Sequence, residues 1–239
     1  ATRPIDAVPW SALDPQEDEI GLARLTIDTH MAGVAFPQDY LKHFHRCALS
    51  STRRFQRQLL HFIRLTWAHD GAGRRHLLIK NPAHTARVPL LLELFPRARF
   101  VLLKREPADA VRSLTLVKQK LAGLIGLQPA PDQQRQVEET AIAHRLLLEA
   151  FEASRSQIPA GQLVEVEYAD LVSSPLTTVE RIYRELSIEG WDQARVSIQA
   201  RVDRAQTYAA CHVQLEPQAE RRLQELFASA STDAADESY

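Results

Sequence analysis

The sequence predicts an α/β fold, a parallel β-sheet flanked by helices. Three short apolar runs, at 76–80, 99–104 and 163–168, have the length and the bounds of buried strands. A segment of helical periodicity follows each run, and this alternation favours a parallel sheet with right-handed crossovers. A parallel sheet of only three strands would leave an uncovered edge. We therefore expect a fold that is truncated at its N-terminal end and lacks a first strand. The uncovered edge could pair with a second copy of the chain, so a homo-oligomer is possible.

The part of the chain before the first strand is predicted to be mainly helical. A helix begins at Asp14-Pro15, because Asp is a favourable N-cap and Pro is favourable at the first helical position. Residues 29–40 are predicted to form a loop, and apolar residues on one face predict a helix over 50–68. The glycines at 71 and 73 then break the chain before the first strand.

Further helices are predicted between and after the strands. Several of these helices begin at a proline, which a helix tolerates in its first turn. They cover His84–Phe95, Pro107–Leu121, 133–154, Pro175–Ser187 and Pro217–Phe227. Residues 229–239 are small, polar and acidic, so they are predicted to be a disordered tail. The rest is expected to form one domain over residues 1–228.

Composition argues against several classes of protein. The 239 residues carry a formal net charge of −1, with the two signs interspersed, and 45% are hydrophobic. This suits a globular core and argues against a nucleic-acid or membrane partner. Cys47 and Cys211 lie far apart, which favours a reducing, cytoplasmic location. His43 and His45 lack the spacing of a closed zinc site, so no metal is expected.

Basic residues follow two of the predicted strands, where a ligand would bind. Lys80 ends the first apolar run, and Lys104-Arg105 ends the second. In open α/β sheets, ligands bind at the carboxyl ends of the strands. These residues alone therefore predict an anionic ligand that carries phosphate or sulfate groups.

The sequence around these strand ends resembles the sulfotransferases that use 3′-phosphoadenosine 5′-phosphosulfate (PAPS), in their bacterial branch. The resemblance is carried by L-I-K-N-P-A-H at 78–84, by L-F-P-R-A-R-F-V at 94–101, and by Arg105 with Ser113. It implies the P-loop-containing nucleoside triphosphate hydrolase-like sulfotransferase fold. The P-x-S-G-T-T loop that binds the 5′-phosphosulfate in this family does not occur in the sequence. We expect a fragment that lacks its first βα unit, the loop included, and is hence inactive alone; a diverged protein that never had the loop is the alternative.

The resemblance also implies a nucleotide site. Arg105 and Ser113 would bind the 3′-phosphate, and a planar guanidinium suits phosphate oxygens. Tyr168 would contact the adenine, although the usual Y-E-D-L reads Y-A-D-L here. Tyr208 would lie in a late loop that contacts the nucleotide. Without the surrounding motif, Arg105 and Ser113 would be read as ordinary surface residues.

Three residues are implied in the chemistry. Lys80 would stabilise the charge that grows on the transferred group and on the leaving phosphate. His84 would take the proton of the acceptor, since imidazole titrates near neutrality. Glu17 is the other candidate base, slightly ahead of Asp18 and Glu19. The structural alternatives are a strand-end lysine in solvent, a helix-start histidine, and carboxylates that complement a helix dipole.

The function expected from these residues is transfer of a sulfuryl group from PAPS to a hydroxyl or amine of a small molecule or protein side chain, without a metal. Two alternatives stay open. One is a nucleotide-dependent kinase, against which the lack of a Walker A lysine counts. The other is a non-catalytic remnant that binds a nucleotide or a protein partner.

Overall fold

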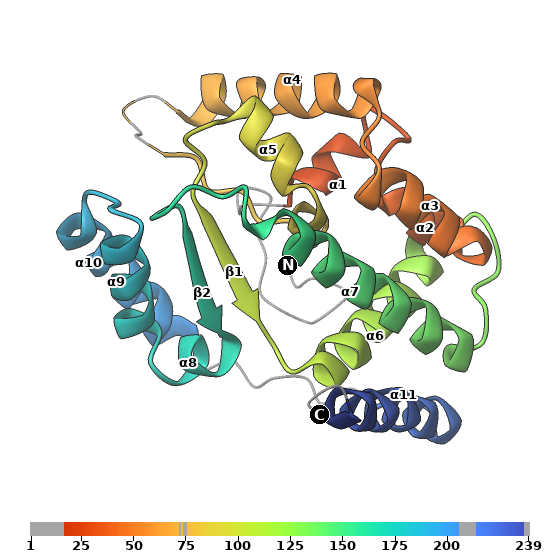
Figure 1. Cartoon of the computed structure of the whole chain (residues 1–239). Helices are drawn as coiled ribbons and strands as arrows, with labels where there is room; N and C mark the ends of the chain where they lie inside the picture. Colours follow the sequence, from red (N-terminus) through yellow and green to blue (C-terminus); the bar gives the residue numbers. More distant parts are fainter. Residues whose placement is uncertain (1–16, 72, 74–75, 206–213, 237–239) are drawn as a thin grey trace.

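The structure is mostly helical around a two-stranded parallel sheet (Figure 1). The computed structural model describes residues 17–71, 73, 76–205 and 214–236. Strands β1 (Phe100–Lys104) and β2 (Leu163–Glu167) pair in parallel, with Phe100 opposite Leu163 and Lys104 opposite Glu167. The two carboxyl ends therefore lie at one edge of the sheet, as the sequence predicts.

The strand predicted at 76–80 is not formed, and this part of the prediction was wrong. Residues 76–80 have no regular secondary structure, and β2 is the one strand that pairs with β1 in the described part of the chain. A strand is held by hydrogen bonds to a neighbour, so an apolar run without one stays irregular. Leu78 is accordingly 89% exposed, and Val101 and Leu103 of β1 are 43% and 47% exposed.

Short helices precede the sheet, where the sequence predicted a loop at 29–40. Local hydrogen bonds within 31–49 can form helical turns that are too brief to show a clear apolar periodicity. The helix predicted over 50–68 is confirmed as α4, where the Thr52 side chain caps the helix by accepting the Phe55 N–H at 3.0 Å. Asp14 and Pro15 lie outside the described residues. The elements are α1 (Asp18–Leu22), α2 (Met31–Ala35), η1 (Pro37–Asp39), α3 (Tyr40–Phe44), the π-helical η2 (His45–Leu49) and α4 (Arg53–Asp70).

The helix predicted over 84–95 is divided in two. It consists of η3 (Pro82–Ala86) and α5 (Val88–Leu94), separated by Arg87 at φ −108° and ψ 19°. Pro89, in the first turn of α5, has no N–H to continue the preceding helix. The later elements are α6 (Pro107–Ile125), α7 (Gln133–Arg155), α8 (Tyr168–Ser173), α9 (Pro175–Glu185), α10 (Trp191–Ala205) and α11 (Pro217–Asp236).

The predicted helices after β1 are therefore present, with three differences. Helices α8 and α10 were not predicted, and α11 continues beyond the expected end at Phe227 into the segment expected to be a disordered tail. Among the described residues, no helix combines the length and the apolar character that crossing a bilayer requires.

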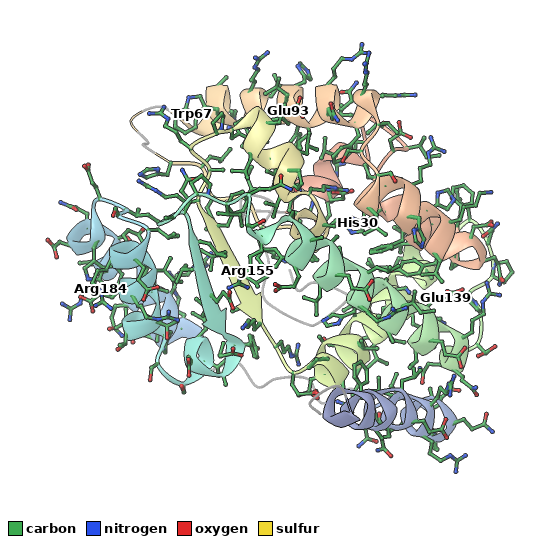
Figure 2. The ribbon with its side chains drawn as sticks, in the orientation of Figure 1. His30, Trp67, Glu93, Glu139, Arg155 and Arg184 are labelled. Carbon is green, nitrogen blue, oxygen red and sulfur yellow. The ribbon has the colours of Figure 1, made fainter. Side chains whose placement is uncertain are left out.

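The helices lie on both sides of the sheet. Figure 1 shows α8–α10 on one side and α6 and α7 on the other. Val164 and Val166 of β2 are buried against Leu186, and Arg155 at the end of α7 pairs with Glu165 of β2 (Figure 2). Separately, α1 packs on α4, and Ala83 of η3 is buried in one cluster with α3 and α7. This packing places α1 and the segment 80–87 next to each other.

Candidate functional site

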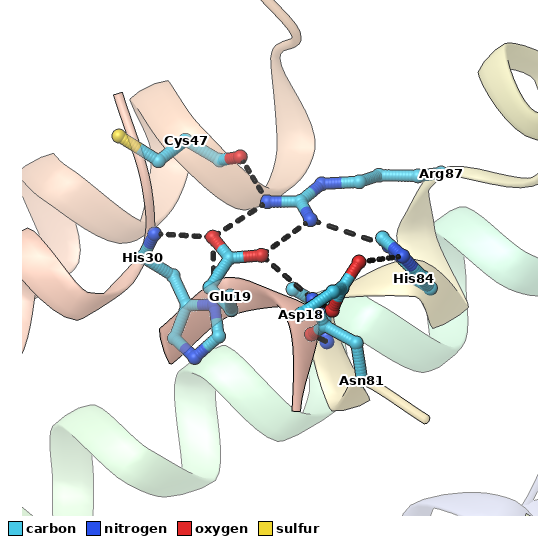
Figure 3. Close-up of polar contacts among 8 residues, drawn as sticks. Asp18, Glu19, His30, Cys47, Asn81, His84 and Arg87 are labelled. Atoms are coloured by element: carbon cyan, nitrogen blue, oxygen red, sulfur yellow. Dashed lines mark hydrogen bonds and ion pairs between the residues drawn. The ribbon is translucent and has the colours of Figure 1, made fainter. Parts of the chain in front are cut away.

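Helix α1 and the segment 80–87 meet through a set of charged and polar side chains (Figure 3). The segment has a fixed local geometry. Asn81 precedes a proline and is extended, as such residues usually are, and its side-chain oxygen accepts the Ala83 N–H at 2.9 Å. This caps η3 and turns the Asn81 amide nitrogen toward α1. That nitrogen donates to Asp18 Oδ1 at 2.8 Å and to Glu19 Oε2 at 2.7 Å.

The innermost contact is an ion pair between Glu19 and Arg87. Their side chains are 0% and 1% exposed, and Arg87 Nη1 donates to Glu19 Oε2 at 2.9 Å. Arg87 Nη2 donates to the Cys47 carbonyl at 2.6 Å, and the guanidinium lies 4.3 Å from the centre of the Phe55 ring. Burial raises the pKa of the Glu19 carboxyl, but hydrogen bonds from His30 and Arg87 outweigh burial and hold this pKa well below its usual range.

The next contact joins Asp18 to His84. His84 Nε2 lies 2.9 Å from Asp18 Oδ2, and the side chains are 12% and 4% exposed. The other ring nitrogen of His84, Nδ1, lies 3.3 Å from Arg87 Nη1. Asp18 and His84 therefore connect the buried Glu19–Arg87 pair to the outer part of the cluster.

The cluster reaches solvent at an ion pair between Lys80 and Glu17. The Lys80 side chain is 73% exposed and that of Glu17 is 30% exposed. The three residues implied in the chemistry, Glu17, Lys80 and His84, are thus brought together, although 63 or more positions separate Glu17 from the other two. The arrangement offers a cation and a carboxylate at the surface, above a buried network that fixes both segments.

A second group of predicted residues lies at the carboxyl edge of the sheet. Arg105 follows β1, and its guanidinium stacks on the ring of Tyr168, which follows β2, at 5.1 Å. Both residues are exposed, as is Ser113 on α6. Arg105 forms no ion pair with any carboxylate of the described residues, whereas Lys104 is paired with Glu165 at 2.6 Å. The hydrogen bond and charge of Glu165 raise the pKa of Lys104 accordingly.

This group could meet an anionic ligand. Arg105 offers a guanidinium, Ser113 offers a hydroxyl, and Tyr168 offers an exposed aromatic ring. Tyr208 lies outside the described residues. In the described part of the chain, no hydrogen bond or ion pair connects this group to the Lys80 cluster, and no cluster of His, Cys, Asp or Glu has the form of a metal site.

Three contributors to the site were missed or misjudged in the sequence. Sequence reasoning assigns no role to Arg87 or Asn81, and it treats Glu19 as a candidate base rather than as a buried partner. No local spacing indicates these contacts, because Asn81 is extended and the partners of Glu19 lie 62 and 68 positions away in the sequence.

Comparison with known proteins identifies the family of the chain. The model of the sulfotransferase family matches residues 12–193, which include both groups of predicted residues except Tyr208. The chain belongs to the sulfotransferase family. Among characterised sulfotransferases, it is 25% identical over 192 residues to the ω-hydroxy-β-dihydromenaquinone-9 sulfotransferase Stf3 of Mycobacterium bovis and of Mycobacterium tuberculosis.

A solved sulfotransferase shares the fold. The crystal structure of STF9 from Mycobacterium avium matches 92% of the chain with a TM-score of 0.71 and 17% identity. The match covers 56% of STF9, and the sequence match covers 78% of this chain but 48% of Stf3. The chain therefore spans about half the length of the sulfotransferases that it resembles.

Proposed function

We propose that the chain contributes to a sulfotransferase that moves a sulfuryl group from PAPS to an acceptor hydroxyl or amine. The observation that carries the proposal is the Lys80–Glu17 pair, a surface cation and carboxylate held above a buried network. Membership of the family supports the reaction class. The family's use of PAPS supports the choice of donor, as does Arg105, which lies beside Tyr168 and has no carboxylate partner among the described residues.

Each residue has a role in this proposal. PAPS, when bound, supplies an activated sulfuryl group. Arg105 and Ser113 bind its 3′-phosphate, and the Tyr168 ring lies against the base. Tyr208 is proposed to contact the nucleotide as well.

Lys80 stabilises the negative charge that develops as the sulfur–oxygen bond to the 5′-phosphate breaks and a new bond to the acceptor oxygen forms. The acceptor proton passes to a base of the same cluster, for which Glu17 and His84 are the two candidates. Adenosine 3′,5′-bisphosphate leaves with the electron pair of the broken bond. An anionic donor competes with Glu17 for Lys80, which frees the carboxylate.

Of the two acceptor groups, a hydroxyl is proposed ahead of an amine. The name of Stf3 specifies an ω-hydroxylated dihydromenaquinone, and this supports a hydroxyl acceptor for a distant relative. We place the reaction in the cytoplasm. In support, Cys47 is a free buried thiol, and burial raises its pKa to about 11, so it is not poised to form a disulfide.

Transfer of label from [³⁵S]PAPS to a panel of alcohols, phenols and amines tests the proposal. The assay uses the 239-residue chain and the same chain expressed with the coding sequence directly before Ala1, because the P-x-S-G-T-T loop is absent from the 239 residues. Transfer by either protein supports the proposal. If both bind adenosine 3′,5′-bisphosphate and neither transfers sulfate, the alternative of a nucleotide-binding protein without catalysis is correct.

A further inference from the structure

The contacts of His84 specify which of its ring nitrogens carries the proton. Arg87 Nη1 lies 3.3 Å from His84 Nδ1, and a guanidinium can only donate. Nδ1 must therefore accept, so the neutral ring carries its proton on Nε2. Nε2 lies 2.9 Å from Asp18 Oδ2, a carboxylate oxygen suited to accept this proton.

We propose that Arg87 locks His84 as the Nε2–H form, and that His84 is a positioning residue for Asp18 rather than the base. This inference rests on the proposed function and selects Glu17 from its two candidate bases. A general base needs a lone pair that faces the acceptor. In His84, the lone pair on Nδ1 faces Arg87 and the proton on Nε2 faces Asp18.

The positioning matters because α1 is too short to hold its own shape. It spans Asp18–Leu22, and its first turn has no side-chain cap. Isolated helices shorter than about 12 residues are marginal in water. Asp18 receives hydrogen bonds from both Asn81 and His84, and these fix the start of α1, with Glu17 immediately before it, against the segment that begins at Lys80.

The direct test is spectroscopic and needs no activity. Nitrogen-15 NMR of the 239-residue chain labelled at histidine reports which ring nitrogen of His84 is protonated, with His84→Gln used to assign the signal. We expect the neutral ring to carry its proton on Nε2 alone. Arg87→Lys keeps the buried positive charge but not the fork of donors, and should release a mixture of tautomers. The double variant Glu19→Gln/Arg87→Gln, which leaves no unpaired buried charge, repeats this test if Arg87→Lys does not fold.

Substitution of His84 adds a functional readout. Glutamine places an amide N–H where Nε2 lies, so it can still donate to Asp18, whereas asparagine is too short to do so. We expect His84→Gln to retain transfer within about threefold and His84→Asn to lose at least about tenfold. A general base typically contributes about 10²–10⁴-fold, so equal losses of this size in both variants would overturn the proposal.

The outcomes separate this inference from the proposed function. An Nδ1–H form, or fast exchange between forms in the wild-type chain, overturns the inference whatever the activity. A locked Nε2–H form, with no sulfate transfer by either of the two proteins in the labelling assay, confirms the geometry of His84 and rejects the proposed function instead.

Discussion

The buried Glu19–Arg87 pair should be worth far more than a surface pair of the same geometry. Arg87→Gln leaves the Glu19 carboxylate buried with its main charged partner removed, and Glu19→Gln does the same to the guanidinium. The side chains are 0% and 1% exposed, and the closest N–O distance is 2.9 Å. Breaking one partner of such a pair costs about 3–5 kcal/mol of the free energy of unfolding.

The double variant should cost clearly less than the sum of the two single variants. Once one charge is gone, removal of the other relieves the unpaired buried charge. We therefore expect a coupling energy of at least about 2 kcal/mol. Arg145 and Glu149 of α7 provide a matched control, since they also pair at 2.9 Å but are 66% and 53% exposed. Their coupling energy should not exceed about 0.5 kcal/mol.

Urea unfolding at pH 7, followed by circular dichroism, measures both cycles with the same chain. Equal m-values across the variants are the condition for comparing the free energies. If the Glu19–Arg87 cycle is additive within about 0.5 kcal/mol, the pair does not anchor the network, and the reasoning about its position in the site fails.

Other substitutions probe the chemistry, the nucleotide site and the core. Lys80→Met should lower turnover by about 10²–10³-fold while nucleotide binding changes much less, because Lys80 acts on developing charge. The control is Lys42→Met, which replaces an exposed lysine on α3. Equal losses in turnover and binding would make Lys80 a simple binding residue. Tyr168→Ala should weaken nucleotide binding by about 1–3 kcal/mol, the scale of a base stacked on an aromatic ring, and calorimetry would show no change if the ring lies outside the site. Lys118 is buried over the Tyr40 ring and donates to Thr140 Oγ1 at 3.0 Å, and burial lowers its pKa to about 7. Between pH 7 and the ordinary value of 10.5 the unfolded chain keeps a proton that the folded chain has lost, so this group makes stability rise with pH, by at most about 4–5 kcal/mol. Lys118→Met should remove that rise in urea titrations at pH 7 and 10, and an unchanged pH dependence would show that Lys118 is not the cause.

Much of the fold could be predicted because its signals are local. Pro107 and Pro175 mark the first turns of α6 and α9, and the apolar runs at β1 and β2 end where the strands end. The run at 76–80 has the same apolar pattern as β1 and β2, but a strand also needs a neighbouring strand. The apolar pattern of a sequence does not indicate whether that neighbour is present. Short helices such as α2 depend on tertiary contacts for the same reason.

Sequence reasoning proposed exposed residues of the candidate site but not the buried residues that hold them. Lys80 and Arg105 lie at motif positions, and Glu17 belongs to an acidic run. Arg87 has no such signal, because a buried arginine is recognised by its partner, and Glu19 lies 68 positions away. The pairing of the acidic run with the segment 80–87 is a fact of three-dimensional contact, which a single sequence does not encode in any local pattern.

The most direct test of the account is whether the chain selects a nucleotide by its 3′-phosphate. Calorimetry compares adenosine 3′,5′-bisphosphate with adenosine 5′-monophosphate on the wild-type chain and on Arg105→Ala, with Arg195→Ala, an exposed arginine of α10, as the control. We predict tighter binding of the bisphosphate and a loss of about 2–3 kcal/mol in Arg105→Ala alone, the scale of a charge-assisted contact, with little change for the monophosphate. Equal affinity of the wild-type chain for both nucleotides would contradict the assignment of Arg105 and, with it, the proposed donor site.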